Sequence, residues 1–128
     1  MSLNNILMNA LRDACEGDFS RFIGRCTEAQ MVGFRALSDA GYSVTMVCGY
    51  YHGEMSDSAR EFFPTDMHSW LQIGDEILDP TRWVFNWENE SPDIFVTSLD
   101  NSDYERAFGN DAWMPHFNDH LTQMGFVI

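Results

Sequence analysis

Hydrophobic residues recur at helical spacing in two stretches near the start of the chain. The first covers residues 4–15. The second begins at Cys26 or Thr27 and ends before Gly41, and its apolar positions are Ala29, Val32, Gly33, Ala36, Leu37 and Ala40. Such a stripe is typical of a helix that packs on a core. Because Cys26 lies on the same stripe, we expect its thiol to face whatever the helix packs on.

Strand patterns follow in the middle of the chain. Residues 42–50, rich in Val and Thr, predict one strand, and residues 94–99 predict another. Residues 68–73 and 76–81 flank a Gly-Asp pair that is typical of a two-residue turn, so they predict a β-hairpin. The order of elements favours an α+β fold in which N-terminal helices pack on an antiparallel sheet.

The other segments are less regular. The polar connection over residues 51–67 is long for a compact domain, and we expect a short helix at 56–63 within it. Aromatic residues then alternate at strand spacing, at Trp83, Phe85 and Trp87. A short helix is expected near residues 104–108, and the pattern predicts no element for the last twenty residues.

Composition narrows the class of protein. The chain has 128 residues, 45% of them hydrophobic, which suits a single domain over residues 1–128. Its net charge of −13 disfavours nucleic acid and anionic membrane lipid as partners and favours a cationic peptide or protein. The three cysteines leave at least one thiol unpaired, and no signal peptide or apolar run of membrane length is evident, so we expect a cytoplasmic protein.

The hairpin predicts a catalytic geometry. With a two-residue turn, Trp70 faces Asp79, which makes His68 and Asp79 diagonal neighbours on one face, about 7–8 Å apart at the backbone. A carboxylate at that spacing can orient an imidazole, and Cys26 at a helix start can form a thiolate. Each residue also has a plain structural explanation, as a buried small side chain, a packed histidine or a turn-forming acid before Pro80.

These residues carry a family resemblance. Cys26 at the start of a helix, followed by His68-Ser69-Trp70 and Asp79-Pro80-Thr81, resembles the transglutaminase-like superfamily of papain-related cysteine hydrolases. The resemblance implies a transglutaminase-like or papain-like core, with nucleophile, general base and orienting acid in that order. It covers residues 26–81, and it departs from the Gly-x-Cys-Trp motif of the larger transglutaminases, because Gly24-Arg25-Cys26-Thr27 stands there.

The function expected from this reading is cysteine-dependent amide hydrolysis, of the peptidase or deamidase type, through an acyl-enzyme. The substrate would be a peptide or protein, with Trp70 and Trp83 as candidate substrate-binding residues and no cofactor. Two alternatives stay open. One is an acyl transferase that uses the same site, and the other is an acidic binding or inhibitory protein that keeps the fold without turnover.

Two other patterns suggest metals but are incomplete. His116 and His120 have the i, i+4 spacing of a zinc site, yet Asp119 stands where Glu is usual and no third ligand is evident. The acidic run at residues 100–103 lacks the glycine and the distal Glu of a calcium loop. We therefore expect no metal.

Overall fold

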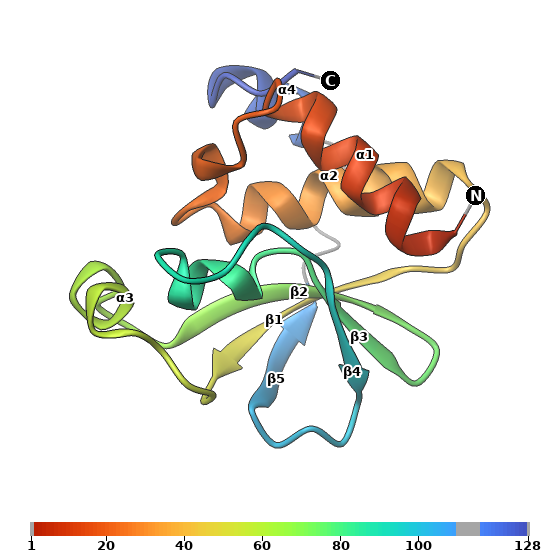
Figure 1. The fold of residues 1–128 in the computed structure, drawn as a ribbon. Helices are drawn as coiled ribbons and strands as arrows, with labels where there is room; N and C mark the ends of the chain where they lie inside the picture. The colour runs from red at the N-terminus through yellow and green to blue at the C-terminus, as the bar shows by residue number, and fades with distance from the viewer. Residues whose placement is uncertain (1, 110–115, 128) are drawn as a thin grey trace.

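The computed structural model describes residues 2–109 and 116–127, which form an α+β fold (Figure 1). The helices are α1 (Leu3–Ala14), α2 (Cys26–Asp39), α3 (Asp57–Phe62) and α4 (Phe117–Gln123), with 3-10 turns η1 (Phe19–Phe22) and η2 (Arg82–Asn86). The strands are β1 (Thr45–Tyr51), β2 (Met67–Ile73), β3 (Glu76–Asp79), β4 (Phe95–Ser98) and β5 (Tyr104–Gly109). They form one antiparallel sheet in the order β4-β3-β2-β1-β5. Across the described ranges, no helix has both the length and the apolarity to cross a membrane.

Helices α1, α2 and α4 lie together on one side of the sheet (Figure 1). The core between these layers is aliphatic and includes Leu7, Leu11, Leu37, Met46, Leu71 and Leu121. The predicted stripe on α2 is buried at Ala29, Val32, Gly33 and Leu37, whereas Ala40 is exposed beyond the helix end. Burial of this stripe fixes α2 against β1 and β2 and so sets where Cys26 lies.

The sheet curls until its two edge strands meet. Strands β4 and β5 are at opposite edges, yet residues 99–103 alone join them (Figure 1). Their aromatic rings pack inside the curl, where Phe95 and Tyr104 stack with ring centroids 6.4 Å apart. Tyr51, Trp70 and Phe85 belong to the same buried cluster. The concave face therefore has its own aromatic core, separate from the aliphatic core under the helices.

The predicted hairpin is confirmed. Strands β2 and β3 pair with Leu71 opposite Leu78 and Ile73 opposite Glu76, the register that a two-residue turn requires. The short helix predicted at residues 56–63 is also present as α3, with the Ser56 hydroxyl accepting a hydrogen bond from the Ala59 N–H.

Two elements differ from the sequence prediction. The helix expected near residues 104–108 is wrong, because this segment is strand β5 and pairs with β1. The aromatic residues after Pro80 alternate at strand spacing, but Trp83 and Phe85 lie buried in the 3-10 turn η2, and Trp87 follows its end. In both cases, contacts with distant parts of the chain outweigh the local pattern.

Gly49 makes room for β5. The β1–β5 register shifts between Cys48 and Gly49, and at this bulge a side-chain Cβ on Gly49 would lie 2.0 Å from the Glu105 carbonyl oxygen. The same Cβ would lie 2.9 Å from the Trp70 ring. Only a residue without a side chain allows β5 to approach β1 this closely.

A buried amide ties α2 to the sheet. Gln30, fully buried, donates from Nε2 to the carbonyl oxygens of Val47 (2.9 Å) and Trp70 (2.7 Å). These carbonyls belong to facing residues of β1 and β2. Because a buried carbonyl without a donor costs free energy, this amide fixes both the height and the rotation of the helix above the strands.

We predict that Gln30→Glu lowers the free energy of unfolding by roughly 3 kcal/mol at neutral pH, because a buried carboxylate would face two carbonyls. Burial raises the pKa of such a carboxyl, so the loss should shrink as the pH falls toward about 4, where the unfolded chain is protonated too. Urea titrations at several pH values measure this. Gln123→Glu, the same change on the exposed face of α4, is the control. Equal effects of the two substitutions would contradict the prediction.

Candidate active site

Cys26 is the first residue of α2. Gly24 directs the chain into the helix with a left-handed φ of +74°, where a Cβ would lie only 3.0 Å from the Phe62 ring. The N-cap residue Arg25 makes no side-chain capping hydrogen bond, so its side chain does not satisfy the N–H groups of the first turn. The partial positive charge of this helix end therefore acts on the Cys26 thiol and on any oxyanion formed beside it.

His68 and Asp79 form a buried ion pair. The His68 Nε2 lies 2.7 Å from the Asp79 Oδ2, and the two side chains are 2% and 0% exposed. The register of the hairpin brings them to one face, as predicted. This bond directs Nε2 toward the carboxylate and leaves Nδ1 as the nitrogen for Cys26.

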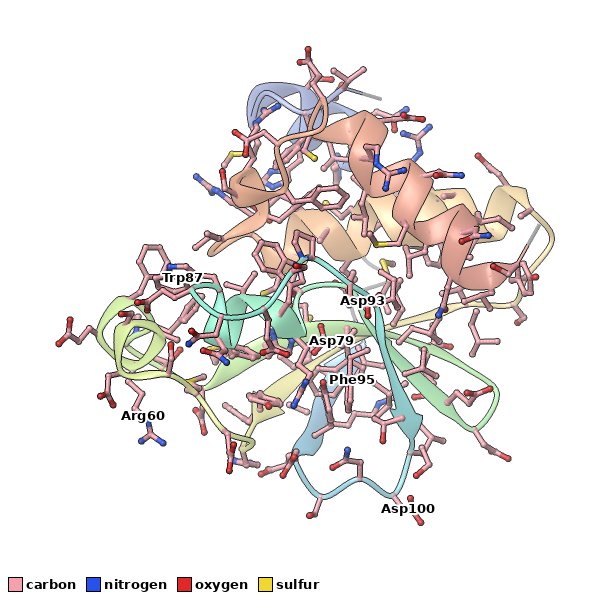
Figure 2. The ribbon with its side chains drawn as sticks, viewed as in Figure 1. Arg60, Asp79, Trp87, Asp93, Phe95 and Asp100 are labelled. Carbon is pink, nitrogen blue, oxygen red and sulfur yellow. The ribbon has the colours of Figure 1, made fainter. Side chains whose placement is uncertain are left out.

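Asp79 has further hydrogen-bond donors. The Tyr104 hydroxyl donates to Oδ2 over 2.7 Å, and the Thr81 backbone N–H donates to Oδ1 over 3.0 Å. Burial raises the pKa of Tyr104, and the neighbouring Asp79 charge raises it further, so the phenol stays protonated and remains a donor. In Figure 2, Asp79 lies in the interior near Phe95, whereas the exposed Asp100 and Arg60 lie at the periphery.

Sequence reasoning missed Tyr104, because its segment was predicted to be helical and was not connected with the hairpin. It comes from β5, the strand on the far side of β1. The only signal in the sequence was the aromatic residue directly after the turn-forming residues 100–103.

The Cys26 thiol is activated by its surroundings. Burial alone would raise the pKa of Cys26, but a hydrogen bond with His68, the charge of His68 and the Ser69 backbone N–H together hold it below the ordinary value. Cys15 and Cys48 are buried, and burial raises the pKa of each of these thiols, in contrast to the partly buried Cys26. Only one of the three thiols therefore forms a thiolate readily.

The charge on His68 is stabilised in the same way. Burial alone would lower the pKa of His68, but the Asp79 charge and hydrogen bond, together with the Cys26 thiol, raise it to about 10. The rings of Phe85 and Tyr51, with centroids 4.8 Å and 5.9 Å from the imidazole, shield it from bulk solvent. The arrangement therefore favours a thiolate–imidazolium pair at neutral pH.

A cavity of about 320 Å³ opens beside the thiol. Its described lining is Cys26, Thr27, Met31, Cys48, Met67, His68, Ser69, Phe108 and His120, so none of these described residues is Asp, Glu, Lys or Arg. Met67 and Phe108 are 57% and 53% exposed, which is unusual for large apolar side chains and is typical of a surface that a ligand covers. The cavity is suited to an uncharged apolar group.

The other candidate residues lie elsewhere. Trp70 is buried in the aromatic core beneath the imidazole, and Trp83 lines a separate hollow beside Arg82, so the structure brings neither to the cavity at Cys26. His120 does line that cavity, and its Nε2 lies 3.8 Å from the Glu28 carboxylate. Residues 100–103 form the turn between β4 and β5. Among the residues that the structure describes, no group of three His, Cys, Asp or Glu side chains could hold a metal ion.

Comparison with known proteins leaves the resemblance as a prediction. No family model matches the chain, and neither a characterised protein nor a solved structure matches it. The geometry of the site is therefore the basis for the proposed function.

We predict that iodoacetamide labels Cys26 selectively at pH 6–7. The lowered pKa of Cys26 supplies thiolate at a pH at which an ordinary thiol, with a pKa of about 8.5, is almost fully protonated. His68→Asn should move this labelling to alkaline pH, because it removes the imidazolium charge. Mass spectrometry of tryptic peptides measures the modification at each cysteine. The exposed His52→Asn is the matched control, and equal labelling of Cys15 or Cys48 would count against a special thiol.

Proposed function

We propose that the chain is a cysteine-dependent amide hydrolase that works through an acyl-enzyme. The observation that carries this proposal is the buried His68–Asp79 pair, joined over 2.7 Å, beside a helix-terminal thiol whose pKa is lowered. A nucleophile, a base within hydrogen-bond reach and a third group that orients the base are the parts that covalent acyl transfer requires. The elements that carry them, a helix and two adjacent strands, match the order expected of a transglutaminase-like core.

Acylation would begin with the Cys26 thiolate. The sulfur attacks the substrate carbonyl carbon, and the backbone N–H of Cys26 at the uncapped helix end donates to the oxyanion. His68 then transfers its proton to the leaving nitrogen, the carbon–nitrogen bond breaks and an amine departs. Asp79 holds the imidazole in place throughout, because three hydrogen bonds fix the position of its carboxylate.

The cavity supports a substrate with an apolar acyl group. Its apolar lining has Met31 at α2, Met67 on β2 and Phe108 on β5, all within one cavity with the nucleophile. His68 in this lining is already paired with Asp79, and His120 lies beside Glu28, so a charged acyl group would find no Lys, Arg, Asp or Glu partner among the described lining residues and would be costly to bury. A peptide or protein with an apolar side chain next to the scissile amide fits this chemistry.

The triad predicts the kinetics of turnover. p-Nitrophenyl hexanoate should release p-nitrophenol in a burst equal to the enzyme concentration, and hexanoyl-p-nitroanilide should be hydrolysed more slowly. Cys26→Ala should abolish the burst, and His68→Ala should lower turnover by roughly 10⁴-fold, because the proton carrier is lost. Stopped-flow absorbance measures the burst and the steady-state rate.

The triad also predicts the pH dependence of the natural chain. Its kcat/KM should rise as the Cys26 thiolate forms, at a pH below the pKa of an ordinary thiol. It should fall as His68 loses its proton near its pKa of about 10.

The exposed His52→Ala controls for loss of an imidazole elsewhere on the chain. Turnover that survives in Cys26→Ala would overturn the proposed function.

Acyl selectivity tests the cavity separately. The kcat/KM for p-nitrophenyl hexanoate should exceed that for the mono-p-nitrophenyl ester of adipic acid by at least about tenfold, because the second ester carries a carboxylate into an apolar cavity. Met67→Ala and Phe108→Ala should each lower kcat/KM for the hexanoate by about tenfold. Leu99→Ala, an exposed apolar residue just after β4, is the control. Indifference of the enzyme to the added carboxylate would exclude this cavity as the acyl site.

A further inference from the structure

A second, much smaller cavity lies on another side of Cys26 and His68. Its volume is about 20 Å³, which is enough for one water molecule, since a single water needs about 10–15 Å³ on this measure. Cys26, His68 and Thr81 contribute the polar side chains of its lining. The rest of the lining is Phe22, Gly24, Phe63, Met67, Val84 and Phe85.

Thr81 is the unusual residue in the lining of this cavity. Thr81 is 2% exposed, and its Oγ1 is the buried side-chain oxygen for which residues 2–109 and 116–127 provide no hydrogen-bond partner. Its backbone N–H is used by Asp79, which fixes the residue next to the catalytic pair. Buried hydroxyls in proteins are normally hydrogen-bonded, so this one indicates a small polar ligand.

We infer that the Thr81 hydroxyl binds one water molecule in this cavity and that this water hydrolyses the acyl-enzyme. Thr81 and Cys26 both line the cavity, and their hydroxyl and sulfur supply the two polar partners that a buried water needs at least. His68 also lines it, and its Nδ1 becomes a third partner once acylation has removed the proton shared with Cys26. The inference rests on the proposed function, and it assigns the acceptor: the chain transfers its acyl group to water rather than to an amine.

The chemical step follows from what acylation leaves behind. After the amine departs, His68 is neutral and Cys26 carries the acyl group as a thioester. The water held by Thr81 gives a proton to His68 while its oxygen bonds to the thioester carbonyl carbon. The carbon–sulfur bond then breaks, which releases the carboxylic acid and restores the thiolate–imidazolium pair. The large cavity holds the acyl group during this step, and the small one supplies the nucleophile.

Thr81→Val tests the inference, because valine keeps the shape and the backbone N–H but removes the hydroxyl. With p-nitrophenyl hexanoate, the burst rate and iodoacetamide labelling of Cys26 should be unchanged, whereas steady-state turnover should fall by about tenfold, the effect of one lost hydrogen bond. Thr81→Ser keeps a hydroxyl and should retain most of the turnover. A crystal structure of the natural chain should show one ordered water within hydrogen-bond distance of Thr81 Oγ1.

The outcomes separate the two proposals. If the natural chain gives no burst, the proposed function fails. If it gives a burst and Thr81→Val turns over at the natural rate, the role of Thr81 is wrong while the proposed function stands. A fall of burst rate and turnover in equal proportion, or a crystal structure without that water, would likewise overturn the inference, since either result makes Thr81 a structural residue.

Discussion

The structure depends on one carboxylate, that of Asp79, which lies where water cannot reach it and which has to be fully hydrogen-bonded there. Asp79 is 0% exposed, and a buried carboxylate without partners would take up a proton or destabilise the fold. Its three hydrogen bonds come from β2, from β5 and from the start of the chain segment after β3. Tyr104 on β5 must reach Asp79 on β3, although β1 and β2 lie between these two strands in the sheet. The sheet has to curl for this contact to form, so the site exists only in the folded sheet.

This requirement also explains why the site has two kinds of core around it. The helices and the convex face of the sheet are held by aliphatic packing, which places Cys26 at a fixed height through α2. The concave face is aromatic, and its rings enclose the imidazole and the carboxylate. Cys26 lies where the aliphatic and the aromatic core meet. It contacts two adjacent residues of β2, namely the imidazole of His68 and the backbone N–H of Ser69. A shift of either layer would separate the sulfur from its partners.

The parts of this arrangement that depend on local order could be predicted from the sequence. A two-residue turn fixes which residues of the hairpin share a face, and this alone predicted that His68 and Asp79 would meet. The amphipathic stripe of α2 likewise predicted a helix that begins at Cys26 or Thr27, and α2 begins at Cys26. Tyr104 could not be predicted, because Glu105, Arg106 and Ala107 favour a helix by propensity and only pairing with β1 makes the segment a strand. Cavities are harder still, since they depend on the shape left between side chains from five or more elements.

The acidity of the chain and the chemistry of its site act at different ranges. The net charge of −13 extends over the surface, yet the described lining of the cavity beside Cys26 contains no Asp or Glu. The surface charge can therefore raise the local concentration of a cationic protein or peptide, an effect that salt screens over about 8–10 Å. Under the proposed function, recognition at the thiol would instead be short-ranged and apolar and would persist at high salt. The proposed substrate would then have a basic surface and present an apolar side chain at the amide to be cleaved.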